Sequence, residues 1–181
     1  MRIEVTVGDV KEAAGDVLAL KYAQSRHGVD AEVATRFWRD GHTDDEISPE
    51  PDQFIFVKSP HGIAAAEVLF LGVERLLKFG YEQIRVFGRE MLAILARERP
   101  QSRALITTVH GPGYGLDEAE AFGSLIAGFV DACRAGDVPA DLELVSIFER
   151  DAGRAQRLRS ELLRLLPNGA LGPTKRPNHA V

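Results

Sequence analysis

The feature that most constrains the fold of this chain is the alternation of short apolar segments with longer amphipathic ones. Residues 17–22 form a nearly continuous apolar run, and residues 67–73 and 104–109 are apolar segments of similar length. Runs of this kind are typical of strands that are covered on both faces of a sheet. Residues 79–99 and 116–134 instead carry apolar side chains at the spacing of an amphipathic helix. Strands that alternate with helices predict an α/β protein whose sheet lies between helical layers.

The predicted elements follow the order β-β-α-β-β-α-β-α-β-α. The predicted strands are residues 2–7, 17–22, 54–57, 67–73, 104–109 and 142–148. The predicted helices are residues 29–39, 79–99, 116–134 and 154–166. A turn at residues 59–62 separates the third and fourth strands, so these two can pair as a hairpin. We therefore predict a three-layer α/β/α fold around a mixed six-stranded sheet.

The length of the chain, 181 residues, fits a single domain. We expect this domain to span residues 1–166, where the last helical pattern ends. Residues 167–181 contain prolines and glycines and have no apolar periodicity, so they predict a flexible tail or linker.

Charge and hydropathy exclude several classes of partner. The formal net charge of −5 argues against nucleic-acid binding, which requires a basic face. No apolar run approaches the roughly 20 residues that a membrane span needs, so we expect no membrane partner. The N-terminus alternates like a strand and does not resemble a signal peptide, so we expect a cytoplasmic protein. An acidic small ligand is still allowed, because helix N-termini and backbone amides bind anions without net positive charge.

The residues that usually hold metals are sparse or badly spaced. The single cysteine, Cys133, cannot form an internal disulfide or a paired-cysteine metal site. Residues 40–52 are rich in acidic side chains, but their spacing does not match that of an EF-hand. We therefore expect neither a metal nor a cofactor.

A glycine-rich loop follows the predicted strand 104–109, in the stretch TTVHGPGYGLDEAEAF. Sheets of this class bind ligands at the carboxyl ends of their strands. Backbone N–H groups of glycines can approach a phosphate closely, and the following helix adds a favourable dipole, although Pro112 removes one donor. Alternatively, the glycines only supply the positive φ angles of a tight turn. The candidate ligand-binding residues of this loop are His110, Gly111, Gly113, Tyr114, Gly115 and Leu116.

Two parts of the chain resemble known families. The pairing of VTVGDVKEAAGDVLALKYAQ with TVHGPGYGLDEAEAF resembles ligand-binding macrodomains. The shared features are a Gly-Asp turn after the first strand, a second strand that ends in a binding motif, and a late glycine-rich phosphate loop. The stretch VLFLGVERLLKFGYEQIRVFGREMLAILARERPQSRALITT resembles the N-terminal, non-catalytic domain of leucyl aminopeptidases. The two resemblances together cover residues 1–166 and imply a macrodomain-like fold.

The macrodomain resemblance implies further ligand contacts. It implies that Asp9 accepts a hydrogen bond from an adenine amino group and that the N–H of Val10 contacts the ring; the alternative is that Asp9 only caps a turn. Gln24 lies just beyond the second predicted strand, at the expected mouth of the cleft. This sequence departs from macrodomains that hydrolyse ADP-ribose linkages, because residues 21–25 contain no asparagine. The aminopeptidase catalytic domain is also absent, which argues against peptidase activity.

The sequence thus predicts a sensor module that binds a nucleotide-type ligand, ADP-ribose or another NAD-derived molecule, without catalysis. Such a module would form the N-terminal part of a longer effector protein. A second hypothesis is a scaffold or homo-oligomerisation module without a ligand, like the aminopeptidase domain. A third is an ADP-ribosyl hydrolase, for which Asp9 and His110 are the only candidate catalytic residues.

Overall fold

The structure is a computed structural model that describes residues 1–168, 170 and 171. Its strands are β1 (Arg2–Val7), β2 (Val17–Tyr22), β3 (Phe54–Lys58), β4 (Glu67–Gly72), β5 (Ala104–Thr108) and β6 (Leu144–Glu149). Its α-helices are α1 (Val29–Arg39), α2 (Tyr81–Glu98), α3 (Glu118–Ala135) and α4 (Ala152–Leu165). Short 3₁₀ turns are η1 (Val10–Glu12), η2 (Asp45–Ile47), η3 (Leu76–Lys78) and η4 (Pro112–Tyr114). The predicted order of strands and α-helices is confirmed.

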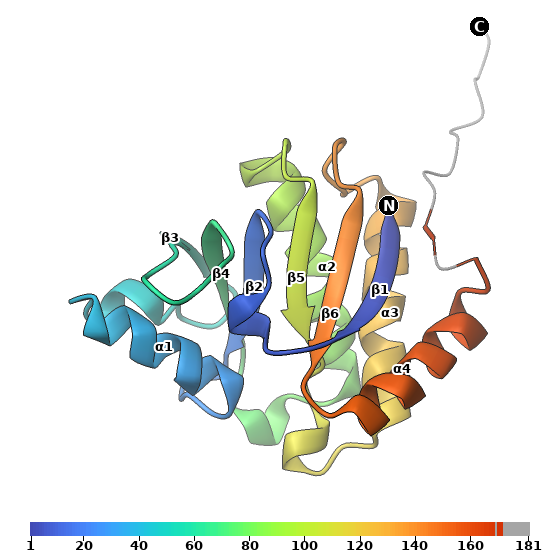
Figure 1. Ribbon diagram of the computed structural model, residues 1–181, viewed down its shortest axis with the longest axis horizontal. Helices are drawn as coiled ribbons and strands as arrows, with labels where there is room; N and C mark the ends of the chain where they lie inside the picture. The colour runs from blue at the N-terminus through green and yellow to red at the C-terminus, as the bar shows by residue number, and fades with distance from the viewer. Residues whose placement is uncertain (169, 172–181) are drawn as a thin grey trace, which may run out of the picture.

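The six strands form one sheet in the order β1-β6-β5-β2-β4-β3 (Figure 1). β3 pairs with β4 in antiparallel orientation, and the other neighbouring pairs are parallel. The mixed six-stranded sheet and the hairpin are therefore both confirmed. The carboxyl ends of β5 and β6 point toward the lower edge of Figure 1, between α1 on the left and α4 on the right.

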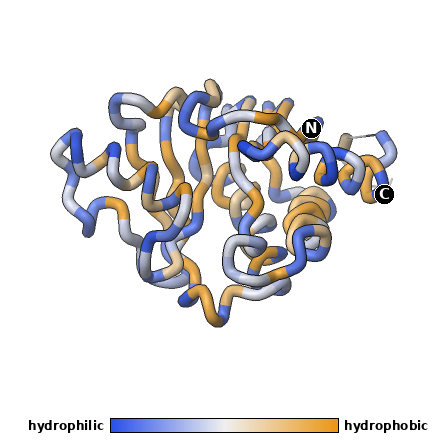
Figure 2. The backbone as a smooth tube through the Cα atoms, turned by 60° about the horizontal axis from the view of Figure 1, so that its bottom comes forward, coloured by the Kyte–Doolittle hydropathy of each residue, from blue (hydrophilic) through white to orange (hydrophobic). Residues whose placement is uncertain are grey.

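Both faces of the sheet are covered, which gives the three predicted layers. Val17 and Ala19 of β2 contribute to a core with α2, α3 and α4. The alternate residues Leu18 and Leu20 contribute to a second core with α1 and η1. Because side chains alternate along a strand, a run that is apolar at every position supplies both cores. In Figure 2, hydrophobic positions are concentrated in the inner part of the tube, and the outer loops are mainly hydrophilic, apart from a hydrophobic loop at the lower edge.

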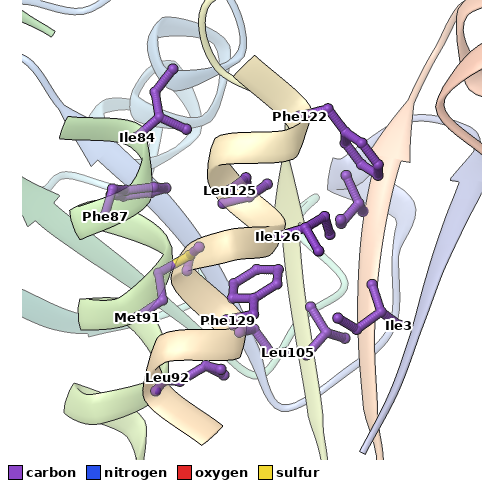
Figure 3. Close-up of a cluster of buried hydrophobic side chains, with 14 of the residues drawn as sticks. Ile3, Ile84, Phe87, Met91, Leu92, Leu105, Phe122, Leu125, Ile126 and Phe129 are labelled. Atoms are coloured by element: carbon purple, nitrogen blue, oxygen red, sulfur yellow. The ribbon is translucent and has the colours of Figure 1, made fainter. Parts of the chain in front are cut away.

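The larger core depends on close contact between α2 and α3. In Figure 3, Ile126 and Phe129 of α3 point toward the strands, and α2 lies beside α3. The two helices touch at Gly88 and Gly128, where an added Cβ on Gly128 would lie 2.1 Å from the carbonyl oxygen of Arg85. Only glycine allows the two backbones to approach so closely.

The helix starts differ slightly from the prediction, and capping explains two of the differences. α3 begins at Glu118, because the Asp117 carboxylate accepts hydrogen bonds from the Ala119 and Glu120 N–H groups. α4 begins at Ala152, because Asp151 accepts from the Arg154 N–H. Both helices were predicted from the spacing of their apolar residues, which does not locate a polar cap.

The predicted tail lies only partly within the structure. Ala170 forms an antiparallel bridge with Arg2, and the Leu171 N–H donates to the Met1 carbonyl at 3.0 Å. The start of the predicted tail is thus bonded to the beginning of β1. The rest of that prediction concerns residues 169 and 172–181, which lie outside the described part of the chain. Of the helices in the described part, none has the length and apolar character that crossing a membrane requires.

Candidate functional site

The sheet has a switch point between β2 and β5. These two strands are parallel neighbours. After β2 the chain continues into α1, which covers one face, and after β5 it continues into α3, which covers the other. Two connections that leave in opposite directions open a crevice at the carboxyl ends of the strands, which is where open α/β sheets bind ligands.

A pocket of about 180 Å³ lies at this edge of the sheet. It is bounded by the turn after β1, the first residue of α1, the end of β5 and the segment that joins β6 to α4. Its lining residues are Gly8, Val10, Val29, Thr108, Val109, Phe148, Glu149, Arg150 and Arg154.

Two kinds of polar group lie at the wall of the pocket. α1 begins at its wall with Val29, and within the described chain no side chain caps this helix, whereas Asp117 and Asp151 cap α3 and α4. An uncapped N-terminus presents N–H groups and a positive dipole end to an anion. The Thr108 hydroxyl is also buried, and no partner for it occurs among residues 1–168, 170 and 171.

Four charged side chains form a network at the rim of the pocket. Arg150 donates to Asp9 at 3.0 Å and to Glu32 at 2.9 Å, and Lys11 pairs with the same two carboxylates. Arg150 and Lys11 hold the pKa of Glu32 down at about 2. Burial alone would raise the pKa of Asp9, but its hydrogen bonds with Lys11 and Arg150 lower it. The network joins the turn after β1, α1 and the segment after β6.

The structure places Asp9 and Val10 at the pocket in different ways. Val10 lines the pocket wall. Asp9 belongs to the rim network, and its other carboxylate oxygen accepts the Lys11 N–H at 3.0 Å, which caps η1. Asp9 therefore has the turn-capping role of the alternative interpretation, and its acceptor capacity is largely used. The adenine contact of Asp9 stays a prediction.

The glycine-rich loop is a compact 3₁₀ turn. Gly111 and Gly115 have φ angles of 121° and 97°, which glycine adopts at little cost. The N–H groups of Tyr114 and Leu116 donate to the Gly111 carbonyl at 3.0 and 3.3 Å, and the Gly115 N–H donates to the Pro112 carbonyl at 3.5 Å. Three of the N–H groups that would form a phosphate cradle are thus bonded inside the loop. Gly113 faces open space, since a Cβ added to it would meet no atom within 4 Å.

His110 and Tyr114 point into the protein. The buried His110 ring packs edge-on against Phe87 of α2, with 5.1 Å between centroids. Burial, helped by the charge of Lys21, lowers the pKa of His110 well below its usual range, so the ring is neutral near pH 7. Tyr114 is partly buried against the α2–α3 core, and its hydroxyl is inaccessible. Burial, followed by the negative charge of Asp30, raises the pKa of that phenol.

Gln24 is turned away from the crevice. Its side-chain amide donates to the Val73 carbonyl at 3.2 Å and to the Pro49 carbonyl at 3.4 Å. These acceptors lie after β4 and before β3, so the amide ties the end of β2 to the other edge of the sheet. A ligand contact through the N–H groups of this amide would require these two bonds to break.

Two features of the site were missed at the sequence level. The first is a buried ion pair between Lys21 of β2 and Asp30 of α1, whose side chains are only 4% and 3% exposed. The second is Arg150. The sequence shows Lys21 near the end of an apolar strand and Arg150 between two predicted elements, but no signal in it pairs either residue with its partner.

A larger pocket of about 300 Å³ lies elsewhere, between β4 and α2. Its walls are mainly apolar, with Leu71, Phe79 and Phe87 among them, and it includes the exposed Val86. It lies outside the β2–β5 switch point, so we favour the smaller pocket as the ligand site. No group of three or more His, Cys, Asp or Glu side chains is placed to hold a metal ion within the residues that the structure describes.

No model of a known protein family matches the chain, and no curated protein matches it in sequence. Solved structures do match. The Oceanobacillus iheyensis macrodomain with ADP has a TM-score of 0.66 and 15% identity, over 91% of this chain and 92% of that one. The Trypanosoma brucei macrodomain in complex with ADP-ribose has a TM-score of 0.68 and 13% identity, over 88% of this chain and 68% of that one. The same T. brucei domain in complex with ADP has a TM-score of 0.67 and 14% identity, over 89% of this chain and 69% of that one.

These comparisons establish the fold. The chain has the macrodomain fold, as the pairing of the Gly-Asp turn with the glycine-rich loop predicted. The resemblance of residues 68–108 to the aminopeptidase domain stays a prediction.

Proposed function

We propose that this chain binds a nucleotide-type ligand in the 180 Å³ pocket, without catalysis. One observation carries the proposal: the pocket lies at the carboxyl ends of β5 and β6, next to the β2–β5 switch point and beside the uncapped N-terminus of α1. Solved structures with the same fold hold ADP or ADP-ribose, which supports this class of ligand.

The pocket suits the two ends of a nucleotide. Val10, Val29 and Phe148 provide apolar walls against which a flat base can pack. The Val29 and Ala31 N–H groups at the start of α1 suit a phosphate, which benefits from the helix dipole, whereas the Asp30 N–H already donates to the His27 carbonyl at 3.2 Å. Within a longer protein, such a module would act as a nucleotide sensor for an attached effector.

The absence of catalysis is part of the proposal. The two candidate catalytic residues have other partners: His110 packs in the core against Phe87, and Asp9 is bonded to Lys11 and Arg150. A general base must reach the proton that it removes. Assays for release of ADP-ribose from a modified protein should therefore show no turnover, and turnover that depends on Asp9 or His110 would support the hydrolase hypothesis instead.

Calorimetric titration of ADP tests the binding. We expect one ADP per chain. Val29→Trp should abolish this binding, because the ring would fill the pocket from the first turn of α1. Val86→Trp is the matched control, since Val86 is exposed and borders the larger pocket; it should leave the affinity unchanged. The proposal would be contradicted if titration of the wild type with ADP released no heat of binding, or if only Val86→Trp lost the binding.

The scaffold function is the second candidate, and the glycine-rich loop favours it. Three N–H groups of this loop are bonded internally, and the Tyr114 hydroxyl is buried, so these four groups are not available to a ligand. Light scattering separates the two functions. A stable oligomer that shows no heat with ADP supports the scaffold, whereas a nucleotide-binding chain supports the ligand site.

A further inference from the structure

The larger pocket, between β4 and α2, is an apolar recess that opens at the surface. Its walls include Leu71, Phe79 and Phe87. The exposed Val86 extends this apolar surface outward. The pocket shares no lining residue with the smaller pocket at the carboxyl ends of β5 and β6. Apolar surface that is gathered in this way and bordered by polar residues marks an interaction site.

Leu77 projects from the protein beside the same pocket. Its side chain is fully exposed, and no other large apolar side chain in the described part of the chain is as exposed. Leu77 lies in η3, between Glu74 and Phe79, which both line the pocket. The Phe79 N–H donates to the Leu76 carbonyl at 3.0 Å, which closes the turn. A projecting leucine is thus held on a bonded turn next to an apolar recess.

The charges around the leucine and around the recess have opposite sign. Leu77 is accompanied by two basic residues, Arg75 before it and Lys78 after it. The charged residues that line the pocket are Asp52, Glu74, Arg89 and Glu90. Three of these four are acidic, and the arginine already donates to Glu90 at 2.8 Å. A basic, apolar projection therefore lies beside an acidic, apolar recess.

Two of these charges have no partner within residues 1–168, 170 and 171. Lys78 lies 3.8 Å from Glu74. The side chains of Arg75 and Asp52, in contrast, form neither a hydrogen bond nor an ion pair in this part of the chain. One basic charge beside the projection and one acidic charge beside the recess are thus available to another molecule.

We infer that this surface binds a second copy of the chain, in a two-fold dimer in which Leu77 of each protomer enters the larger pocket of its partner. A two-fold interface brings together the same patch from both subunits, so the patch must contain a projection and a matching recess. This face contains both. The rotation also brings the basic Arg75 of each protomer toward the acidic rim that contains Asp52 of its partner, which favours this pairing electrostatically.

The dimer is independent of the nucleotide function. It uses none of the residues that line the smaller pocket, so each protomer can bind a nucleotide whether or not it is paired. The inference also differs from a scaffold without a ligand, because it names the surface through which the chain associates and leaves the ligand site in place.

Sedimentation equilibrium of the full chain tests the dimer. We expect the mass to rise toward that of two chains as the concentration increases. Leu77→Asp should weaken the dimer by about tenfold or more, because it places a carboxylate against the acidic rim of the partner's pocket. Leu163→Asp is the matched control, since Leu163 is also an exposed leucine but lies on α4. It should leave the dimer Kd unchanged.

Three results of this experiment would overturn the inference. The first is a mass that stays that of one chain up to about 1 mM protein. The second is a dimer that tolerates Leu77→Asp, and the third is a dimer that both aspartate variants weaken equally. A monomeric chain whose larger pocket binds the apolar dye ANS would assign the surface to a small apolar ligand instead.

A charge exchange tests the contact across the two-fold axis. Arg75→Glu and Asp52→Lys should each weaken the dimer, because like charges then face each other. The double variant should recover most of the wild-type affinity, since the opposite charges are restored with their positions exchanged. Additive weakening in a folded double variant would contradict this arrangement of the two protomers.

Discussion

At the residue scale, Arg150 links the parts of the candidate site. Its guanidinium joins Asp9, in the turn after β1, to Glu32 of α1. Arg150 is 141 residues from Asp9 and 118 from Glu32 along the chain, so no local pattern in the sequence pairs them. The turn after β1 and the start of α1 are thus held in place by a contact that only the folded chain provides.

This network predicts how stability depends on pH. The pKa of Glu32 is about 2 in the folded protein, against an ordinary value of 4.5. A lowered carboxyl pKa stabilises the fold above the unfolded pKa, and this stabilisation is lost as the pH falls from about 4.5 toward 2. Arg150→Gln should therefore destabilise the protein at pH 7 at low salt, and the difference from the wild type should shrink as the pH approaches 2.

Urea unfolding at several pH values measures this effect. The control is Arg39→Gln, since Arg39 is exposed and forms no ion pair in the described part of the chain. Its stability should follow the wild-type curve. A difference between Arg150→Gln and the wild type that stays constant from pH 7 to pH 2 would show that Arg150 does not act through Glu32.

At the scale of the elements, apolar patterns predicted the strands and helices well and their ends less well. The run at residues 17–22 predicted a strand buried on both faces, and β2 supplies both cores. The starts of α3 and α4 were missed because Asp117 and Asp151 set them through hydrogen bonds to backbone N–H groups. A cap is a single polar residue, so the spacing of the apolar residues does not show where it lies.

The candidate site was also predicted only in part, because some of its features depend on contacts in the folded chain. The glycine-rich loop was located correctly after β5, and its glycines do adopt positive φ angles. Its internal hydrogen bonds to the Gly111 and Pro112 carbonyls were not predicted, because they depend on the 3₁₀ geometry of η4. The inward orientation of His110 was missed because it depends on Phe87, which lies on another helix.

The α2–α3 contact gives a prediction at this scale. A Cβ at Gly128 would lie 2.1 Å from the Arg85 carbonyl oxygen, so Gly128→Ala must force the two helices apart. We expect a loss of about 1–3 kcal/mol in the free energy of unfolding, as for other overpacked sites. Gly123→Ala, also in α3, meets nothing within 4 Å and should stabilise the protein by about 0.5–1 kcal/mol. Urea denaturation measures both, and a Gly128→Ala variant as stable as the wild type would disprove the close contact.

At the scale of the whole molecule, the fold was predictable and the location of the site largely follows from it. The element order predicted the three layers and the macrodomain fold, and the β2–β5 switch point then follows from the topology. What the topology does not decide is which of several cavities binds the ligand, and two of them are compared in this respect. The larger one lies between β4 and α2, and the smaller one lies at the switch point. We assign the ligand to the smaller one because it lies at the carboxyl ends of β5 and β6, beside the N-terminus of α1.

Backbone amide chemical shifts of the full chain, recorded during a titration with ADP, test this assignment most directly. We expect saturable shifts at Gly8, Val10, Val29, Thr108 and Arg150, which line the smaller pocket. We expect no comparable shifts at Gln53, Val73, Gln83, Val86 and Arg89, which line the larger one. Shifts confined to the second group, or no saturable shift at either group, would contradict this assignment.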